Sequence, residues 1–133
     1  MAAKRISVHC VEIADKPGSL QQLLEKAASA NVDFQGFAAF SAGGGRGQVY
    51  LSAKDPQALT ACAQDVGVQL TEAAGFIISS ADRVGVAAED LKGLADAGIN
   101  GIAGAAMVCE GQYQMLIVVN AADGDAAAKA LGA

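Results

Sequence analysis

The feature that most constrains the fold of this chain is a short loop sequence that occurs twice. Asp15-Lys16-Pro17-Gly18 lies between a strand-like run and a helical pattern, and Asp82-Arg83-Val84-Gly85 lies in the same setting 67 residues later. In both copies an acid, a cation and a glycine precede a helix whose first backbone N–H groups have no partner inside the helix. The 133 residues are therefore expected to form two units of about 65 residues that share a core.

Hydrophobic periodicity predicts a similar order of strands and helices in the two halves. The strands expected in the first half are 5–13, 32–41, 49–51 and 68–70, and its helices begin after Gly18 and at Asp55-Pro56. The second half is expected to contain strands at 76–80, 99–109 and 113–119, with helices after Gly85 and at 123–131. The order is therefore β-α-β-β-α-β followed by β-α-β-β-α.

This order is typical of an α+β fold with two ferredoxin-like βαββαβ units in tandem, antiparallel sheets and helices on one face. We place the first domain at 1–73 and the second at 74–133, and the last strand of the second unit is missing. That gap would leave the strand at 76–80 as an exposed sheet edge unless another chain or the first unit covers it. Dimerisation is one solution, and we expect a homodimer.

Charge and hydropathy exclude two classes of partner. The net charge is −5 and the nine Lys and Arg residues are scattered, whereas nucleic-acid binding needs clustered cations. No apolar run reaches the roughly 18 residues that cross a bilayer, and no secretory segment precedes the first strand. We therefore expect a cytoplasmic protein that binds neither nucleic acid nor membrane.

The other residues with potential chemistry favour structural roles. Cys10, Cys62 and Cys109 are far apart, so buried, reduced thiols are expected. His9 has no second histidine with which to build a metal site. The glycine-rich run 43–47 lacks the Lys-Ser/Thr ending of a phosphate-binding loop and predicts a hairpin turn. We expect neither a metal nor a cofactor.

The first copy of the loop carries the longer motif. Asp15-Lys16-Pro17-Gly18-Ser19-Leu20 opens an amphipathic helix that ends in Asn31-Val32-Asp33. In a βαββαβ frame this motif resembles the ACT domain family, and its repetition resembles small stand-alone double-ACT proteins. The resemblance implies a regulatory module that binds an amino acid or a related small molecule where two ACT units pack side by side. The loop acid, the loop glycine and the residue at the start of the second strand would contact the ligand.

The resemblance also assigns positions on this chain. The implied contacts are Asp15, Gly18 and Asp33 in the first unit and Asp82, Gly85 and Asn100 in the second, flanked by Lys16, Pro17, Ser19, Arg83 and Val86. The sequence departs from the motif at two places. Val84 stands where the motif prefers proline, which weakens the preorganisation of the second loop, and Asp33 is acidic where an amide is common.

The chemistry of the loops agrees with this implication. An α-amino acid needs hydrogen-bond donors for its carboxylate and acceptors for its ammonium group, and a helix N-terminus beside Asp15 or Asp82 offers both. The alternative is that each aspartate only caps its helix, which stabilises a helix by about 1 kcal/mol without any ligand.

The expected function is therefore regulatory and non-enzymatic. An amino acid or related small molecule would bind at the interfaces between ACT units, and its occupancy would pass allosterically to a partner, for which an enzyme is a candidate. One alternative is a ligand-free interaction module or regulatory subunit of the same fold. A second is a ferredoxin-like enzyme with a loop aspartate as acid or base, but neither loop has a nucleophile or a paired basic group nearby.

Overall fold

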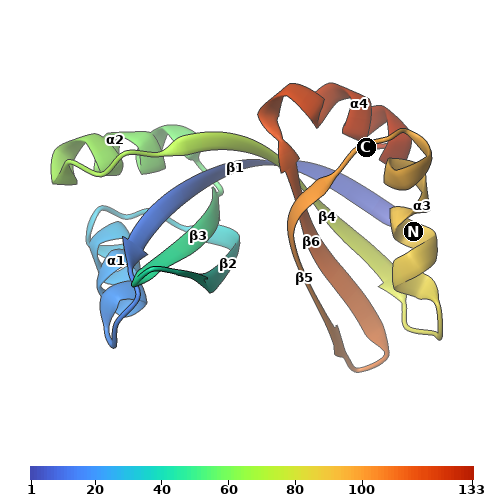
Figure 1. The fold of residues 1–133 in the computed structure, drawn as a ribbon, viewed down its shortest axis with the longest axis horizontal. Coiled ribbons are helices and arrows are strands. Elements are labelled where there is room, and N and C mark those ends of the chain that lie inside the picture. Colours follow the sequence, from blue (N-terminus) through green and yellow to red (C-terminus); the bar gives the residue numbers. More distant parts are fainter. The chain divides into compact units, whose positions relative to one another are not determined.

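The computed structural model describes all residues, 1–133, and they group into two compact units (Figure 1). Ser7–Glu72 form one of them, which we call the N-terminal unit. Ala73–Ala133 form the other, the C-terminal unit, together with Met1–Ile6. The division near residue 73 lies close to the boundary that the sequence suggested, but the first six residues group with the far half of the chain.

Each half has the order strand, helix, strand, strand, helix. The elements are β1 (Ala2–Ala14), α1 (Ser19–Ser29), β2 (Phe34–Gly43), β3 (Arg46–Ala53), α2 (Pro56–Val66), β4 (Thr71–Ala81), α3 (Val86–Asp96), β5 (Gly101–Cys109), β6 (Gln112–Asn120), a 3-10 turn (Ala121–Asp123) and α4 (Gly124–Leu131). The predicted α+β class is confirmed, with antiparallel pairing in both hairpins. None of the helices is long and apolar enough to cross a membrane.

β1 belongs to both units. In the N-terminal unit the strand order is β2-β3-β1, and His9–Ala14 of β1 pair antiparallel with β3. In the C-terminal unit the order is β1-β4-β6-β5, and the part of β1 that groups there ends at Ile6. β4 therefore lies between two strands, because β1 covers the edge that the missing last strand would otherwise leave exposed. The edges are β2 and β5.

β2 and β5 begin two residues later than predicted because apolar residues close the preceding helices. Val32, Val68 and Ile99 were each expected to start a strand, but their N–H groups donate to Ala27, Ala63 and Leu94, each at 2.9 Å. This is the Schellman arrangement, in which the residue after a left-handed position bonds back to the last helical turn. The predicted strand at 68–70 is consequently absent, and β4 starts at Thr71 and runs straight through Gly75.

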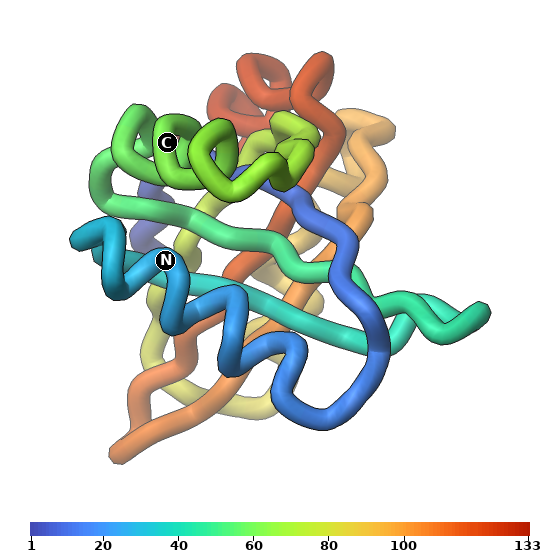
Figure 2. Tube along the Cα trace, turned by 90° about the vertical axis from the view of Figure 1, so that its left-hand side faces the viewer, coloured from blue at the N-terminus to red at the C-terminus, as the bar shows by residue number.

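Each unit has its own hydrophobic core between its helices and one face of its strands, so the expectation of a shared core is wrong. In the N-terminal unit α1 and α2 cover the same face of the strands (Figure 2). Its core contains Val11, Ala27, Val32, Val49, Leu51, Ala53 and Leu59. The core of the C-terminal unit contains Ala74, Phe76, Ile78, Val86, Leu94, Tyr113, Met115, Ile117, Val119, Ala127, Ala128 and Leu131.

Candidate functional site

The two loops predicted as ligand sites have nearly the same backbone conformation. Gly18 has φ 86° and ψ −12°, and Gly85 has φ 88° and ψ −5°. These left-handed angles favour glycine because a Cβ atom would strain the backbone there. Each glycine is the residue directly before its helix, and no side chain caps α1 or α3. The first-turn amides of both helices are thus left without a side-chain acceptor.

Hydrogen bonds fix both loops to the neighbouring hairpin in the same way. The N–H of Asp15 donates to the carbonyl oxygen of Gly45 at 2.9 Å, and the N–H of Asp82 donates to that of Gly111, also at 2.9 Å. Gly45 and Gly111 have φ 74° and 76° in two-residue turns of the type that connects strand pairs. The repeat in the sequence is therefore a repeat in structure, and the glycine-rich run is the hairpin turn that was predicted.

Asp15 does not cap its helix. Its carboxylate accepts a hydrogen bond at 2.7 Å from the hydroxyl of Ser41, which lies on β2. By contrast, Asp55 caps α2, since its Oδ1 accepts from the N–H of Gln57 at 3.1 Å. The capping alternative is thus not met at Asp15, and no side chain caps α3 after Asp82 either.

The first loop borders a shallow hollow of about 230 Å³. Asp15, Lys16 and Ser19 line the hollow from the loop, and Phe40, Ser41 and Gln48 line it from the strands. A carboxylate, an ammonium group, two hydroxyls and an amide thus converge beside an aromatic ring. Such a hollow offers both donors and acceptors to a small polar ligand.

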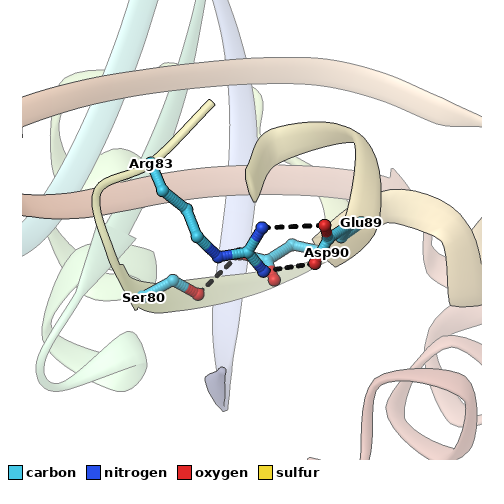
Figure 3. Close-up of polar contacts among 4 residues, drawn as sticks. All are labelled: Ser80, Arg83, Glu89 and Asp90. Atoms are coloured by element: carbon cyan, nitrogen blue, oxygen red, sulfur yellow. Dashed lines mark hydrogen bonds and ion pairs between the residues drawn. The ribbon is translucent and has the colours of Figure 1, made fainter. Parts of the chain in front are cut away.

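The second loop has a different charge arrangement. Arg83 Nη1 donates to Glu89 Oε1 at 2.8 Å, and a second contact joins Nη2 to the other carboxylate oxygen (Figure 3). This hydrogen bonding lowers the pKa of Glu89 and raises the pKa of Arg83. The guanidinium is therefore bound to the first turns of α3. Val84 is fully exposed, whereas Val86 lies in the hydrophobic core with 5% of its surface exposed.

Within one unit the loop and the start of the second strand lie far apart. Asp15 contacts Ser41 near the end of β2, while Asp33 stands directly before its first residue, about 25 Å away at the usual rise per residue. Asp33 Oδ2 instead accepts from Lys54 Nζ at 2.6 Å. In the C-terminal unit Asn100 likewise precedes β5, whereas Asp82 bonds to the turn beyond its end. No single unit brings its expected contacts together.

A buried polar cluster was not predicted. Asp90 of α3 is only 8% exposed, and its Oδ2 accepts from the Ser80 hydroxyl of β4 at 2.7 Å (Figure 3). The hydroxyl of Tyr113 is buried with no hydrogen-bond partner. Burial raises the pKa of Tyr113, and the Asp90 carboxylate raises it further. The sequence does hold a signal, because Asp90 interrupts the apolar stripe of α3 between Val86 and Leu94.

The expectation of three buried thiols is wrong, because none of them is fully buried. Cys109 is exposed, while Cys10 and Cys62 are half-buried. Burial raises the pKa of Cys10, against the opposing effect of its hydrogen bond with Tyr50. No three His, Cys, Asp or Glu side chains lie close enough together to hold a metal ion.

Comparison with known proteins identifies the fold. No protein-family model matches the chain, and no curated protein matches it. The regulatory subunit of aspartate kinase from Thermus thermophilus, in its ligand-free form, has a TM-score of 0.67 at 18% identity over 98% of this chain and 93% of its own. Such regulatory subunits are built from ACT domains. The chain has the tandem ACT fold.

Two further structures share the tandem ACT fold. A protein from Bacteroides thetaiotaomicron has a TM-score of 0.75 at 16% identity, over 96% of this chain and 88% of its own. The aspartate kinase of Clostridium acetobutylicum, described as an allosteric enzyme, has a TM-score of 0.62 at 14% identity. That match covers 98% of this chain and 32% of the kinase.

Proposed function

We propose that this protein is a non-enzymatic regulator that binds an amino acid or a related small molecule through its β-to-α loops. The repeated loop carries the proposal: a left-handed glycine before an uncapped helix, beside an aspartate that is held by the adjacent hairpin. Uncapped first-turn amides attract a carboxylate, and the aspartate can accept from an ammonium group. The aspartate kinase regulatory subunits with this fold support a regulatory role.

The first loop is the better site of the two. It borders the hollow that contains Lys16 and Ser19, whereas Arg83 of the second loop is already paired with Glu89. Pro17 also fixes the backbone of the first loop, and Val84 cannot do the same in the second. We therefore assign ligand binding first to Asp15, Gly18 and their neighbours.

A complete site requires a second ACT unit. Asp15 and Asp33 lie at opposite ends of β2, so one ligand cannot touch both within one unit. We propose that a second copy of the chain supplies the missing contacts, with a homodimer as the functional form. A ligand that binds the dimer more tightly than the monomer then shifts the association equilibrium, and a partner protein senses that shift.

The experiment that tests the proposal is a thermal-shift screen of the full chain against the twenty amino acids. A ligand that binds only the folded state raises the melting temperature. We expect a selective hit that Asp15→Ala removes and Asp96→Ala, a surface control on α3, leaves unchanged. If Asp82→Ala removes the thermal shift and Asp15→Ala does not, the ligand binds at the second loop instead.

A flat screen with an intact cooperative melt would contradict ligand binding. It would support the ligand-free interaction module, which one observation favours: both edge strands are apolar and exposed, with Phe37 and Phe40 on β2 and Met107 and Val108 on β5. The next measurement would then be a search for the partner protein.

A further inference from the structure

The N-terminal unit is one strand short of the fold that its elements predict. A βαββαβ unit has four strands, and the C-terminal unit reaches that number in the order β1-β4-β6-β5. The N-terminal unit has the order β2-β3-β1, and β4 contributes only Thr71 and Glu72 to it. The predicted strand at 68–70 is absent. The end of β1 therefore has no fourth strand of its own unit on the side away from β3.

This outer edge of β1 presents backbone hydrogen-bonding groups. The N–H of Asp15 donates to the carbonyl oxygen of Gly45 at 2.9 Å, so the backbone groups of Asp15 face β3. Successive residues of a strand point these groups to opposite sides, so Glu12 and Ala14 point theirs away from β3. Their N–H and C=O groups are open to an added strand.

A polar groove of about 540 Å³ borders this edge. Cys10, Val11 and Glu12 line it from β1, Gln48 lines it from β3, and Val68 and Gln69 line it from the segment after α2. That segment does not pair with β1, because the N–H groups of Gly67 and Val68 donate back to α2, at 3.3 and 2.9 Å. No backbone hydrogen bond joins 67–70 to β1.

The lining selects the chemistry of an added strand, whose side chains would alternate between two faces. On the face toward the helices they would meet Val11 and Val68, which both pack in the core of the unit. On the other face they would meet Glu12 and Gln48, which lie directly opposite each other. Glu12 is the only charged residue of the groove. Its pair with Arg46, at 3.3 Å, leaves its side chain 55% exposed, so a second cation can approach it.

We propose that this edge of β1 binds an extended cationic segment of a partner protein, which adds to the sheet as a fourth strand. Main-chain hydrogen bonds supply affinity, and alternating apolar and basic side chains supply specificity. A second copy of the chain fits less well. β1 paired antiparallel with itself about Glu12 brings two carboxylates together, and the edge strands β2 and β5 contain no cation. The groove contains no residue of either loop, so this site goes beyond the proposed function.

Peptide titrations followed by nuclear magnetic resonance test the chemistry on the isotopically labelled full chain. The probes are acetylated and amidated pentapeptides with the sequences Val-Lys-Val-Lys-Val, Val-Thr-Val-Thr-Val and Val-Glu-Val-Glu-Val. We expect the lysine peptide to shift the amide signals of Glu12 and Ala14 saturably below about 1 mM. The threonine peptide should bind about threefold more weakly and the glutamate peptide about tenfold more weakly. No saturable shift with the lysine peptide, or tightest binding by the glutamate peptide, would overturn the proposal.

Variants at Glu12 separate the backbone contribution from the charge. Glu12→Gln keeps the N–H group and removes the carboxylate, so it should weaken the lysine peptide about threefold and leave the threonine peptide unchanged. Glu12→Pro removes the outward N–H without the loss of a bond to β3 and should abolish binding of both. Ala39→Pro on β2 is the matched control, because Ala39 lies opposite Val49, whose backbone groups face β1, and its N–H also points away from β3. Lysine-peptide binding that survives Glu12→Pro would overturn the site.

Hydrogen exchange tests the edge without a peptide. The amides of Glu12 and Ala14 should exchange at least about tenfold faster than those of Val11 and Ile13, which face β3, and the lysine peptide should slow them. Equal protection of all four amides in the free protein would show that the edge is already paired and would overturn the proposal. Protection that appears only as the protein concentration rises would assign the edge to a second copy and overturn the partner segment.

Asp15→Ala separates this edge from the first loop, since only Gln48 lines both the groove and the hollow. The variant should leave peptide binding unchanged. Peptide binding that is lost in Asp15→Ala and kept in Glu12→Pro would place the peptide in the hollow and overturn this site. A flat amino-acid screen with intact peptide binding would contradict the proposed function alone.

Discussion

The Ser80 hydroxyl donates a 2.7 Å hydrogen bond to the buried carboxylate of Asp90 and thereby joins β4 to α3 beneath the second loop (Figure 3). Tyr113 lies directly opposite Ser80 on β6, and its buried hydroxyl has no partner. The cluster thus contains one satisfied pair and one unsatisfied group, and their energetic consequences have opposite signs.

We expect Tyr113→Phe to stabilise the protein and Ser80→Ala to destabilise it. Removing an unsatisfied buried hydroxyl should raise the free energy of unfolding by about 1 kcal/mol. Removing the Ser80 hydroxyl leaves a buried carboxylate without its partner and should lower it by about 1–3 kcal/mol. Urea denaturation followed by circular dichroism measures both changes. A destabilised Tyr113→Phe variant would show that the hydroxyl has a stabilising role.

The raised pKa of Tyr113 predicts a loss of stability at alkaline pH. The folded-state pKa lies above the unfolded value of about 10, so the folded state holds the proton more tightly. The resulting stabilisation is fully present below pH 10 and disappears as the pH rises through the folded pKa. Burial also raises the pKa of Tyr50, so the two tyrosines share this dependence. Tyr113→Phe should flatten the stability profile above about pH 10 without abolishing the decline. An identical alkaline decline in wild type and variant would contradict this.

The left-handed glycines before α1 and α3 should each resist substitution for a backbone reason alone. A Cβ atom at Gly18 would meet only Gln22 Nε2 at 4.0 Å, and one at Gly85 would meet nothing within 4 Å. Gly18→Ala and Gly85→Ala should therefore each cost about 1–2 kcal/mol, the strain of a left-handed alanine. Gly36→Ala is the matched control, because its Cβ is equally free and its φ is not left-handed. Equal melting temperatures for all three variants would contradict the strain argument.

The sequence predicted the elements well and their beginnings less well, for one physical reason. Val32, Val68 and Ile99 are apolar residues next to apolar runs, and periodicity cannot separate a strand start from the residue that closes a helix. The left-handed residue before each of them, Asn31, Gly67 or Gly98, was the available signal. The sequence did indicate helix ends at these residues, but the apolar residue after each one still bonds back to the helix, so no strand starts there.

The sharing of β1 between the two units could not be predicted from local pattern. Ala2–Ala14 has the pattern of one strand, and nothing in its alternation shows that its first residues group with the C-terminal unit and the rest with the N-terminal unit. The loop repeat, in contrast, was predictable from the matched spacing, and Gly18 and Gly85 have nearly the same backbone conformation. The separation of Asp15 from Asp33 could not be predicted. A family motif gives the types of its residues and not the end of the sheet at which each one lies.

Thiol modification should follow exposure and pKa. Cys109 is exposed, whereas Cys10 is half-buried and has a raised pKa, which lowers its thiolate fraction at neutral pH. We expect iodoacetamide to modify Cys109 at least about tenfold faster than Cys10, with peptide mass spectrometry to assign the sites. Cys109→Ser should remove the fast phase. A fast phase that survives in Cys109→Ser would place the reactive thiol elsewhere.

The last prediction concerns the dimer and its edge strand. β2 pairs only with β3, contains no charged residue, and exposes Phe37 by 45% and Phe40 by 43%. Natural sheets protect such an edge with charge or cover it with another strand, and no charge protects this one.

We propose β2 as the edge of the homodimer, because it carries these two aromatic rings and borders the hollow beside the first loop, where a second copy would meet the ligand. Phe37→Lys should therefore weaken dimerisation by at least about tenfold, measured by light scattering after size-exclusion chromatography. Met107→Lys places the same charge on the edge strand β5 and should leave the dimer intact. If Met107→Lys alone dissociates the dimer, β5 is the interface. A wild-type monomer at micromolar concentration would remove the dimer from the mechanism altogether.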